Sequence, residues 1–137
     1  MHSFTGTVEE MERLIGMGLC VGVNGCSLKT EEGLKVVKRI PLERIMLETD
    51  GPWCEIRPSH ASAAVLKQDG GGEAVVELPK AVKKEKWSRE CMVKGRNEPC
   101  MIVNVARVVA RVKGISVEAV TEAAWRNSVR MFGFDEV

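Results

Sequence analysis

The sequence lacks an excess of charge of either sign, because 20 lysines and arginines nearly balance 19 aspartates and glutamates. A near-neutral chain has no overall field that draws it to nucleic acid or to a membrane surface, so any attraction to a polyanion must be local. Long hydrophobic runs are also missing, and a membrane-spanning helix needs roughly eighteen apolar residues or more. With neither such a run nor a targeting segment, we expect a soluble protein of the cytoplasm or nucleus that has no membrane partner.

Cysteine spacing of the kind that builds a zinc ribbon or a disulfide framework is absent as well. The number of cysteines is odd, and no two of them form a Cys-x-x-Cys motif. Both features favour reduced thiols in an intracellular protein. The cysteines are Cys20, Cys26, Cys54, Cys91 and Cys100.

A repeated strand-and-helix unit occupies about the first 50 residues. Capping residues predict two helices, one that follows Thr7 and one that follows Thr30. Short apolar runs predict strands whose ends fall near Phe4, Val23 and Glu48. These ends are roughly 20 to 25 residues apart, which is typical of consecutive βα units joined by right-handed crossovers. The pattern predicts parallel α/β structure, although 137 residues are fewer than the roughly 200 or more of a complete (β/α)₈ barrel.

The rest of the chain has a different pattern. Residues 55–99 carry no sustained period and contain three consecutive glycines, which predicts a long loop with an irregular insertion around those glycines. Helical spacing returns at about 100–113 and again at about 116–132. In the last helix the pattern places Trp125 and Phe132 on the inward face.

Two residues at the predicted strand ends are candidate metal ligands. His2 precedes the first capped helix, and Asp50 follows the apolar run 45–47 and precedes a Gly-Pro turn. The carboxyl ends of parallel strands meet at one face, so the imidazole and the carboxylate are expected to face the same mouth. Both are ligand types suited to Mg²⁺, Mn²⁺ or Zn²⁺. The alternatives are a packed or exposed His2 and an Asp50 that only caps the turn.

Five strings of residues carry a resemblance to a known family. They are His2-Ser3-Phe4-Thr5-Gly6 and the segments 22–30, 48–54, 96–99 and 127–133. In type and in order these strings resemble the C-terminal half of the TatD-related metal-dependent deoxyribonucleases. The Asn-Gly-Cys-Ser-Leu-Lys-Thr string and the Trp-Cys pair are most similar to the eukaryotic subgroup of that family.

This resemblance implies the C-terminal portion of a (β/α)₈ TIM barrel of the amidohydrolase type, about its last three βα units. It also implies hydrolysis of DNA phosphodiester bonds by metal-activated water. His2 and Asp50 correspond to metal ligands of the family, with Mg²⁺ as the expected cation and Mn²⁺ or Zn²⁺ as alternatives. The resemblance also implies that Asp50 orients or deprotonates the attacking water. Arg96, Asn97 and Glu98 match a family motif that is expected to brace the loop near the mouth.

The histidine count departs from the family pattern. The family's metal site also uses a His-x-His after the first strand, a glutamate after the fourth and a histidine after the fifth, whereas this chain has only His2 and His60. We therefore expect residues 1–137 to form one incomplete barrel domain that self-associates or needs a complementary N-terminal half. Three interpretations stay open: a deoxyribonuclease, a non-catalytic truncated fragment, and an amidohydrolase-type enzyme that acts on a non-nucleic substrate.

Basic and aromatic residues supply candidate contacts to DNA. Residues 80–96 carry seven lysines and arginines against two glutamates. Lys84 could contact phosphate while Trp87 stacks on a base, and Trp53 beside Asp50 is placed to touch a substrate. The alternative is a solvated loop with one anchoring aromatic ring.

Overall fold

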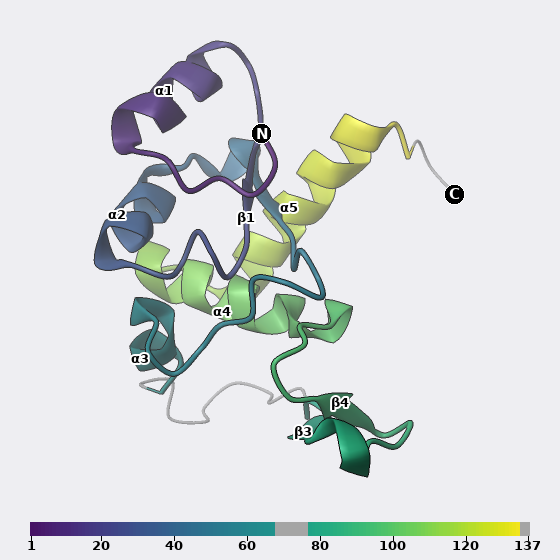
Figure 1. Cartoon of the computed structure of the whole chain (residues 1–137). Coiled ribbons are helices and arrows are strands. Elements are labelled where there is room, and N and C mark those ends of the chain that lie inside the picture. Colours follow the sequence, from purple (N-terminus) through teal and green to yellow (C-terminus); the bar gives the residue numbers. More distant parts are fainter. Residues whose placement is uncertain (68–76, 135–137) are drawn as a thin grey trace.

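The computed structural model has a mixed α/β fold and describes residues 1–67 and 77–134 (Figure 1). Five α-helices of this part are α1 (Val8–Gly16), α2 (Glu31–Arg39), α3 (Ala61–Lys67), α4 (Ile102–Lys113) and α5 (Val117–Phe132). Its strands are β1 (Val21–Val23), β2 (Ile45–Leu47), β3 (Lys80–Val82) and β4 (Cys91–Val93). Short 3₁₀ turns lie at η1 (Leu42–Arg44), η2 (Lys84–Lys86) and η3 (Pro99–Met101). No helix in the described part is long and apolar enough to cross a membrane.

Two parallel strands form the centre of the fold. β1 pairs with β2 in a register that sets Val21 opposite Ile45 and Val23 opposite Leu47. The amino-terminal residues run along the other edge of β1, where the Gly22 amide donates to the Met1 carbonyl at 2.8 Å and the Phe4 amide donates to the Gly22 carbonyl at 3.0 Å. The three predicted strand ends therefore lie side by side.

The predicted capping residues begin the helices. The Thr7 hydroxyl accepts from the Glu10 amide, and the Glu10 carboxylate accepts from the Thr7 amide, which completes a capping box at α1. The Thr30 hydroxyl accepts from the Gly33 amide at the start of α2. Each cap satisfies amide groups that have no partner within the helix, so these helices begin where the sequence predicts.

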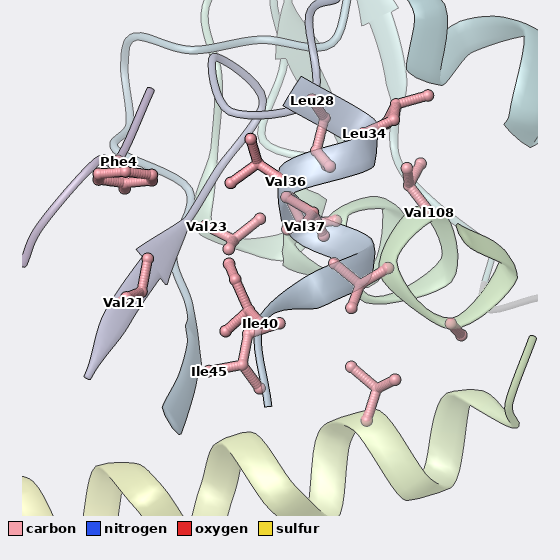
Figure 2. Close-up of a cluster of buried hydrophobic side chains, with 14 of the residues drawn as sticks. Phe4, Val21, Val23, Leu28, Leu34, Val36, Val37, Ile40, Ile45 and Val108 are labelled. Carbon is pink, nitrogen blue, oxygen red and sulfur yellow. The ribbon is translucent and has the colours of Figure 1, made fainter. Parts of the chain in front are cut away.

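The main core lies between the parallel strands, α2 and the two C-terminal helices (Figure 2). Figure 2 shows Val37 of α2 and Ile40, which directly follows α2, pointing toward this interior, where Val23 of β1 and Val108 of α4 also lie. Each of these side chains is at most 2 % exposed. Full burial of one such aliphatic side chain contributes about 1.5 to 3 kcal/mol, so this core is the main source of stability in the described part.

The segment 55–99 differs from the predicted long loop. It contains α3 and a two-stranded parallel sheet in which Lys80 pairs with Cys91 and Val82 with Val93. Three-residue strands are too short to give a recognisable period, and α3 is only 7 residues long. The predicted insertion around the triple glycine falls on residues 68–76, which lie outside the described residues.

The inward face of α5 also differs from the prediction. Trp125 is 67 % exposed and Phe132 is 62 % exposed, whereas Val120, Ala124 and Asn127 are buried. The Asn127 amide explains this rotation, because its Nδ2 donates to the carbonyls of Leu42 and Ile45, each at 2.7 Å. The buried face of α5 thus includes the polar residue Asn127. A prediction from hydrophobic spacing alone places Trp125 and Phe132 on that face instead.

We predict that Asn127→Ala destabilises the fold by about 2 to 3 kcal/mol, because two carbonyl groups near the η1–β2 junction lose their donor. Urea denaturation followed by circular dichroism measures the change. Ser128→Ala is the matched control, since among the described residues the Ser128 hydroxyl bonds only within α5, to the Ala124 carbonyl. Equal stability of the two variants would contradict the role given to Asn127.

Candidate functional site

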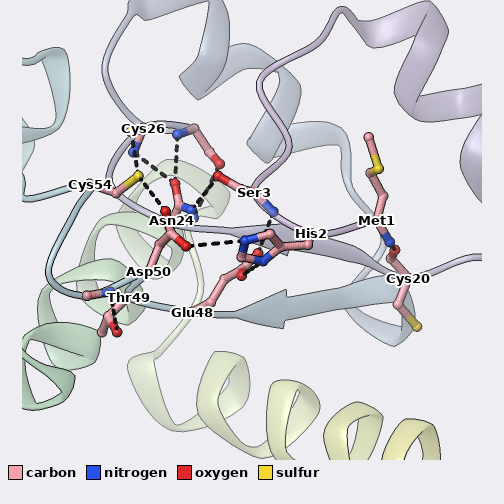
Figure 3. A network of polar contacts seen from close by, with 12 residues as sticks. Met1, His2, Ser3, Cys20, Asn24, Cys26, Glu48, Thr49, Asp50 and Cys54 are labelled. Atoms are coloured by element: carbon pink, nitrogen blue, oxygen red, sulfur yellow. Dashed lines mark hydrogen bonds and ion pairs between the residues drawn. The ribbon is translucent and has the colours of Figure 1, made fainter.

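A polar cluster lies at the carboxyl ends of the central strands. Nδ1 of His2 pairs with the Glu48 carboxylate, and Nε2 of His2 lies 3.2 Å from Oδ1 of Asp50 (Figure 3). The His2 side chain is 66 % exposed, while the side chains of Glu48 and Asp50 are 21 % and 29 % exposed. The structure therefore brings the two predicted ligands, His2 and Asp50, together at a site that is open to solvent.

Glu48 belongs to this cluster although the sequence interpretation did not select it. Its second carboxylate oxygen, Oε1, accepts from the Ser3 amide at 2.7 Å. A Cβ atom on Gly22 would overlap the Glu48 carboxylate, so the glycine leaves the space that this carboxylate occupies. The sequence signal was available, because Glu48 and Asp50 are two residues apart at a strand end and such residues point to the same face.

Asn24 fixes the turn that follows β1. The side chain is fully buried and its Nδ2 donates to the Ser3 hydroxyl at 2.8 Å. Its Oδ1 accepts from the amides of Cys26 at 2.9 Å and Ser27 at 3.4 Å. The same side chain therefore ties the amino-terminal segment to the β1–α2 turn, and the buried amide has partners for both of its polar atoms.

Two free cysteines lie next to Asp50. The Cys54 thiol donates to Oδ2 of Asp50 at 3.3 Å, and the Cys26 thiol donates to the Cys54 sulfur at 2.6 Å. Burial, the Cys26 thiol and the Asp50 carboxylate together raise the pKa of Cys54 to about 12. At neutral pH Cys54 therefore keeps its proton and acts as a hydrogen-bond donor to Asp50 rather than as a nucleophile.

The turn after β2 holds Asp50 in an unusual backbone conformation. Asp50 has a φ of 56°, in the left-handed region that non-glycine residues seldom adopt. Asn97 supports this turn with two hydrogen bonds. Its side-chain Nδ2 donates to the Thr49 carbonyl at 2.8 Å, and its backbone amide donates to the Pro52 carbonyl at 3.0 Å. Asn97 is buried, and both of these bonds reach the turn that carries Asp50.

The flanking residues Arg96 and Glu98 pair with each other at 3.2 Å. Within the described residues neither of them forms an ion pair or a side-chain hydrogen bond with the Asp50 turn, so Asn97 is the member of this motif that bonds to the turn. Trp53 lies in the same turn as Asp50, where its amide donates to the Asp50 carbonyl at 2.8 Å, and it is 71 % exposed.

Lys84 and Trp87 lie away from the polar cluster. Lys84 begins η2 and Trp87 follows it, in the connection between β3 and β4, which Figure 1 shows set apart from the main helices. Both side chains are exposed. Among the described residues, no hydrogen bond or ion pair joins them to His2 or Asp50. The structure therefore leaves these two predicted DNA contacts separate from the candidate ligands.

The donor types at the cluster fit part of a divalent-metal site. An imidazole and a carboxylate face each other, and both are common ligands of such ions. The described residues contain no group of three or more histidine, cysteine, aspartate or glutamate side chains arranged to hold a metal ion. His2 and Asp50 thus suit a metal in kind, and further donors would be needed to complete its coordination.

Comparisons with known proteins show the family of this chain. The family described as TatD related DNase matches residues 1–133. The chain is 53% identical over 132 residues to Deoxyribonuclease Tat-D of Schizosaccharomyces pombe, covering 96% of this chain and 40% of that protein.

Solved structures give the same result for the fold. An uncharacterized amidohydrolase from Saccharomyces cerevisiae superposes with a TM-score of 0.88 and 42% identity, covering 96% of this chain and 39% of the other. A hydrolase TatD family protein from Entamoeba histolytica gives a TM-score of 0.84 and 36% identity, with 96% and 40% covered. The chain spans about two fifths of the length of these relatives. The chain belongs to the TatD-related DNase family and is similar to its eukaryotic members.

Proposed function

We propose that this chain acts as part of a metal-dependent deoxyribonuclease that hydrolyses phosphodiester bonds of DNA. His2 and Asp50 would hold a divalent cation, with Mg²⁺ as the first candidate and Mn²⁺ or Zn²⁺ as alternatives. When bound, such a cation activates water and stabilises charge on phosphate oxygens. The observation that carries the proposal is the approach of His2 Nε2 to Asp50 Oδ1 at 3.2 Å, at the strand ends of a chain from a DNase family.

The surrounding residues would prepare Asp50 for this role. The Cys54 thiol donates to one oxygen of the carboxylate and His2 faces the other, so both oxygens have a defined direction. Asn97 holds the turn that carries Asp50 through the Thr49 and Pro52 carbonyls. Orientation of this kind lowers the cost of ordering the reacting groups.

We expect Asp50→Asn to reduce cleavage of linear DNA by about 100-fold or more, because the substitution removes the negative charge that would bind the cation. The measurement is the release of labelled fragments in Mg²⁺ or Mn²⁺, with chelator added in a parallel reaction. Glu12→Gln is the matched control, since Glu12 is an exposed carboxylate on α1.

Unchanged cleavage by Asp50→Asn would overturn the assignment of Asp50. Absence of cleavage by the unsubstituted chain would favour the second candidate, a non-catalytic fragment that lacks the remaining metal ligands. That candidate is favoured by one observation, namely that the described residues offer no complete metal-binding group.

We propose that the connection between β3 and β4 contacts the DNA substrate. Lys84 and Trp87 are exposed there, and Lys80, Lys83 and Lys86 add positive charge around them. Lysines of such a segment can neutralise phosphates while an exposed indole stacks on an unpaired base. Trp53, which is exposed beside Asp50, would contact the substrate nearer to the scissile bond.

Each of the substitutions Lys84→Gln and Trp87→Ala should weaken DNA binding. Loss of the Lys84 charge should also make the plot of log affinity against log salt concentration less steep, by the amount that corresponds to about one phosphate contact. Fluorescence anisotropy with a labelled single-stranded oligonucleotide at several salt concentrations measures both effects. Lys67→Gln serves as control, because Lys67 is an exposed lysine at the end of α3. Equal affinities of all variants would show that this segment is a solvated loop.

We also propose that the chain self-associates or binds a complementary N-terminal half of the barrel. β2 has β1 as its only strand partner among the described residues, so its other edge has no strand ladder. Trp125 and Phe132 are exposed on α5, and Phe134 follows it. The rings of Phe132 and Phe134 lie 5.8 Å apart, and exposed apolar side chains that gather in this way favour a contact site.

We predict that sedimentation velocity shows association that increases with protein concentration, and that Trp125→Gln shifts the chain toward the monomer. Removal of one exposed indole lowers the apolar area that association can bury. Trp53→Gln is the control, because Trp53 is equally exposed at the polar cluster instead of on α5. A monomer over the whole concentration range would contradict self-association.

A further inference from the structure

We infer that Glu48 is a positioning residue that keeps the proton of the neutral His2 imidazole on Nδ1 and leaves the Nε2 lone pair facing Asp50. The inference deepens the proposed function, since it rests on a role for His2 at the metal site. It concerns the tautomer of this chain's own histidine, so it can be tested without a metal ion.

The Glu48 carboxylate is held at both of its oxygens. Oε2 pairs with Nδ1 of His2, and Oε1 accepts from the Ser3 amide at 2.7 Å. Gly22 leaves the space for this arrangement, since a Cβ atom on residue 22 would overlap the carboxylate in its present position. The acceptor that faces Nδ1 is therefore fixed in position before any ligand binds.

The segment that carries His2 is fixed as well. Ser3 has a φ of 49°, and this left-handed conformation turns the chain between His2 and Phe4. Two partners hold that conformation: Glu48 accepts from the Ser3 amide, and Asn24 donates to the Ser3 hydroxyl at 2.8 Å. A non-glycine residue keeps this conformation only where its surroundings determine it. These contacts orient the imidazole toward β2.

Two carboxylates compete for the single proton of the neutral imidazole, and the geometry favours Glu48. Asp50 lies 3.2 Å from Nε2, and its other oxygen already accepts from the Cys54 thiol. Nδ1 of His2 pairs with Oε2 of Glu48, and the Glu48 side chain is less exposed than that of Asp50, at 21 % against 29 %. Water competes less for a carboxylate that is less exposed, so the charge-assisted hydrogen bond to Glu48 is the stronger one. The proton is therefore retained at Nδ1, and an electron pair is available at Nε2.

His60 provides an internal reference with the opposite arrangement. Its Nδ1 accepts from the Arg57 amide at 3.3 Å, which requires an unprotonated Nδ1 and places the proton on Nε2. The chain has only these two histidines, so a spectrum contains two sets of imidazole signals, and the set that a His60→Gln variant loses belongs to His60.

The test is nitrogen NMR of the metal-free full chain labelled with ¹⁵N-histidine, at a pH where the His2 signals have reached their neutral limit. For His2 we expect a protonated-type signal from Nδ1 and an unprotonated-type signal from Nε2, and for His60 the reverse. Glu48→Gln should reverse the His2 pattern. Its amide oxygen would accept from the Ser3 amide, so its NH₂ group would face Nδ1 and require an acceptor there.

Glu12→Gln is the control and should leave both patterns unchanged. A wild-type His2 with its proton on Nε2 would overturn the inference, and so would an unchanged tautomer in Glu48→Gln. The wild-type spectrum alone decides if the variant fails to fold. Loss of the proposed nuclease activity with the expected tautomer intact would count against the function and leave the role of Glu48 standing.

Discussion

The candidate site depends on the two hydrogen bonds that the backbone of Gly22 forms with the amino-terminal residues. Its amide donates to the Met1 carbonyl and its carbonyl accepts from the Phe4 amide, so β1 holds the amino-terminal residues along one edge. On the other edge β1 pairs with β2 in parallel register. The absence of a side chain at residue 22 leaves room for the Glu48 carboxylate. One small residue thereby aligns three segments and permits the contact between Glu48 and His2.

Three buried asparagines then join the strands to the neighbouring segments by hydrogen bonds. Asn24 connects the amino-terminal segment to the turn after β1, Asn97 holds the turn after β2, and Asn127 ties α5 to the η1–β2 junction. Each of these asparagines is buried and donates through its side-chain amide. Buried amides stabilise a structure only when partners are in place, which makes them specific to one arrangement of the segments. The cluster around Asp50 and the position of α5 are consequently both supported by directional hydrogen bonds in addition to hydrophobic contacts.

Local features of the structure could be predicted well from the sequence. Thr7 and Thr30 begin helices as predicted because a cap is an interaction over three residues. The central strands were predicted from short apolar runs, and the family was identified from ordered strings that the comparisons support. The inward face of α5 was predicted wrongly, with Trp125 and Phe132 exposed, because hydrophobic spacing carries no information about the carbonyls that Asn127 reaches. Segment 55–99 was predicted as a loop because three-residue strands have no period.

The sequence by itself determined which residue types stand at the strand ends, and with them the family and the candidate pair His2 and Asp50. These are properties of short strings and need no knowledge of distant contacts. Only the tertiary structure decided that Glu48 faces Nδ1 of His2, that Cys54 donates to Asp50, and that Lys84 and Trp87 lie apart from both. Hydrogen bonds between segments 20 to 50 residues apart depend on register and backbone direction, which are set when the strands pair.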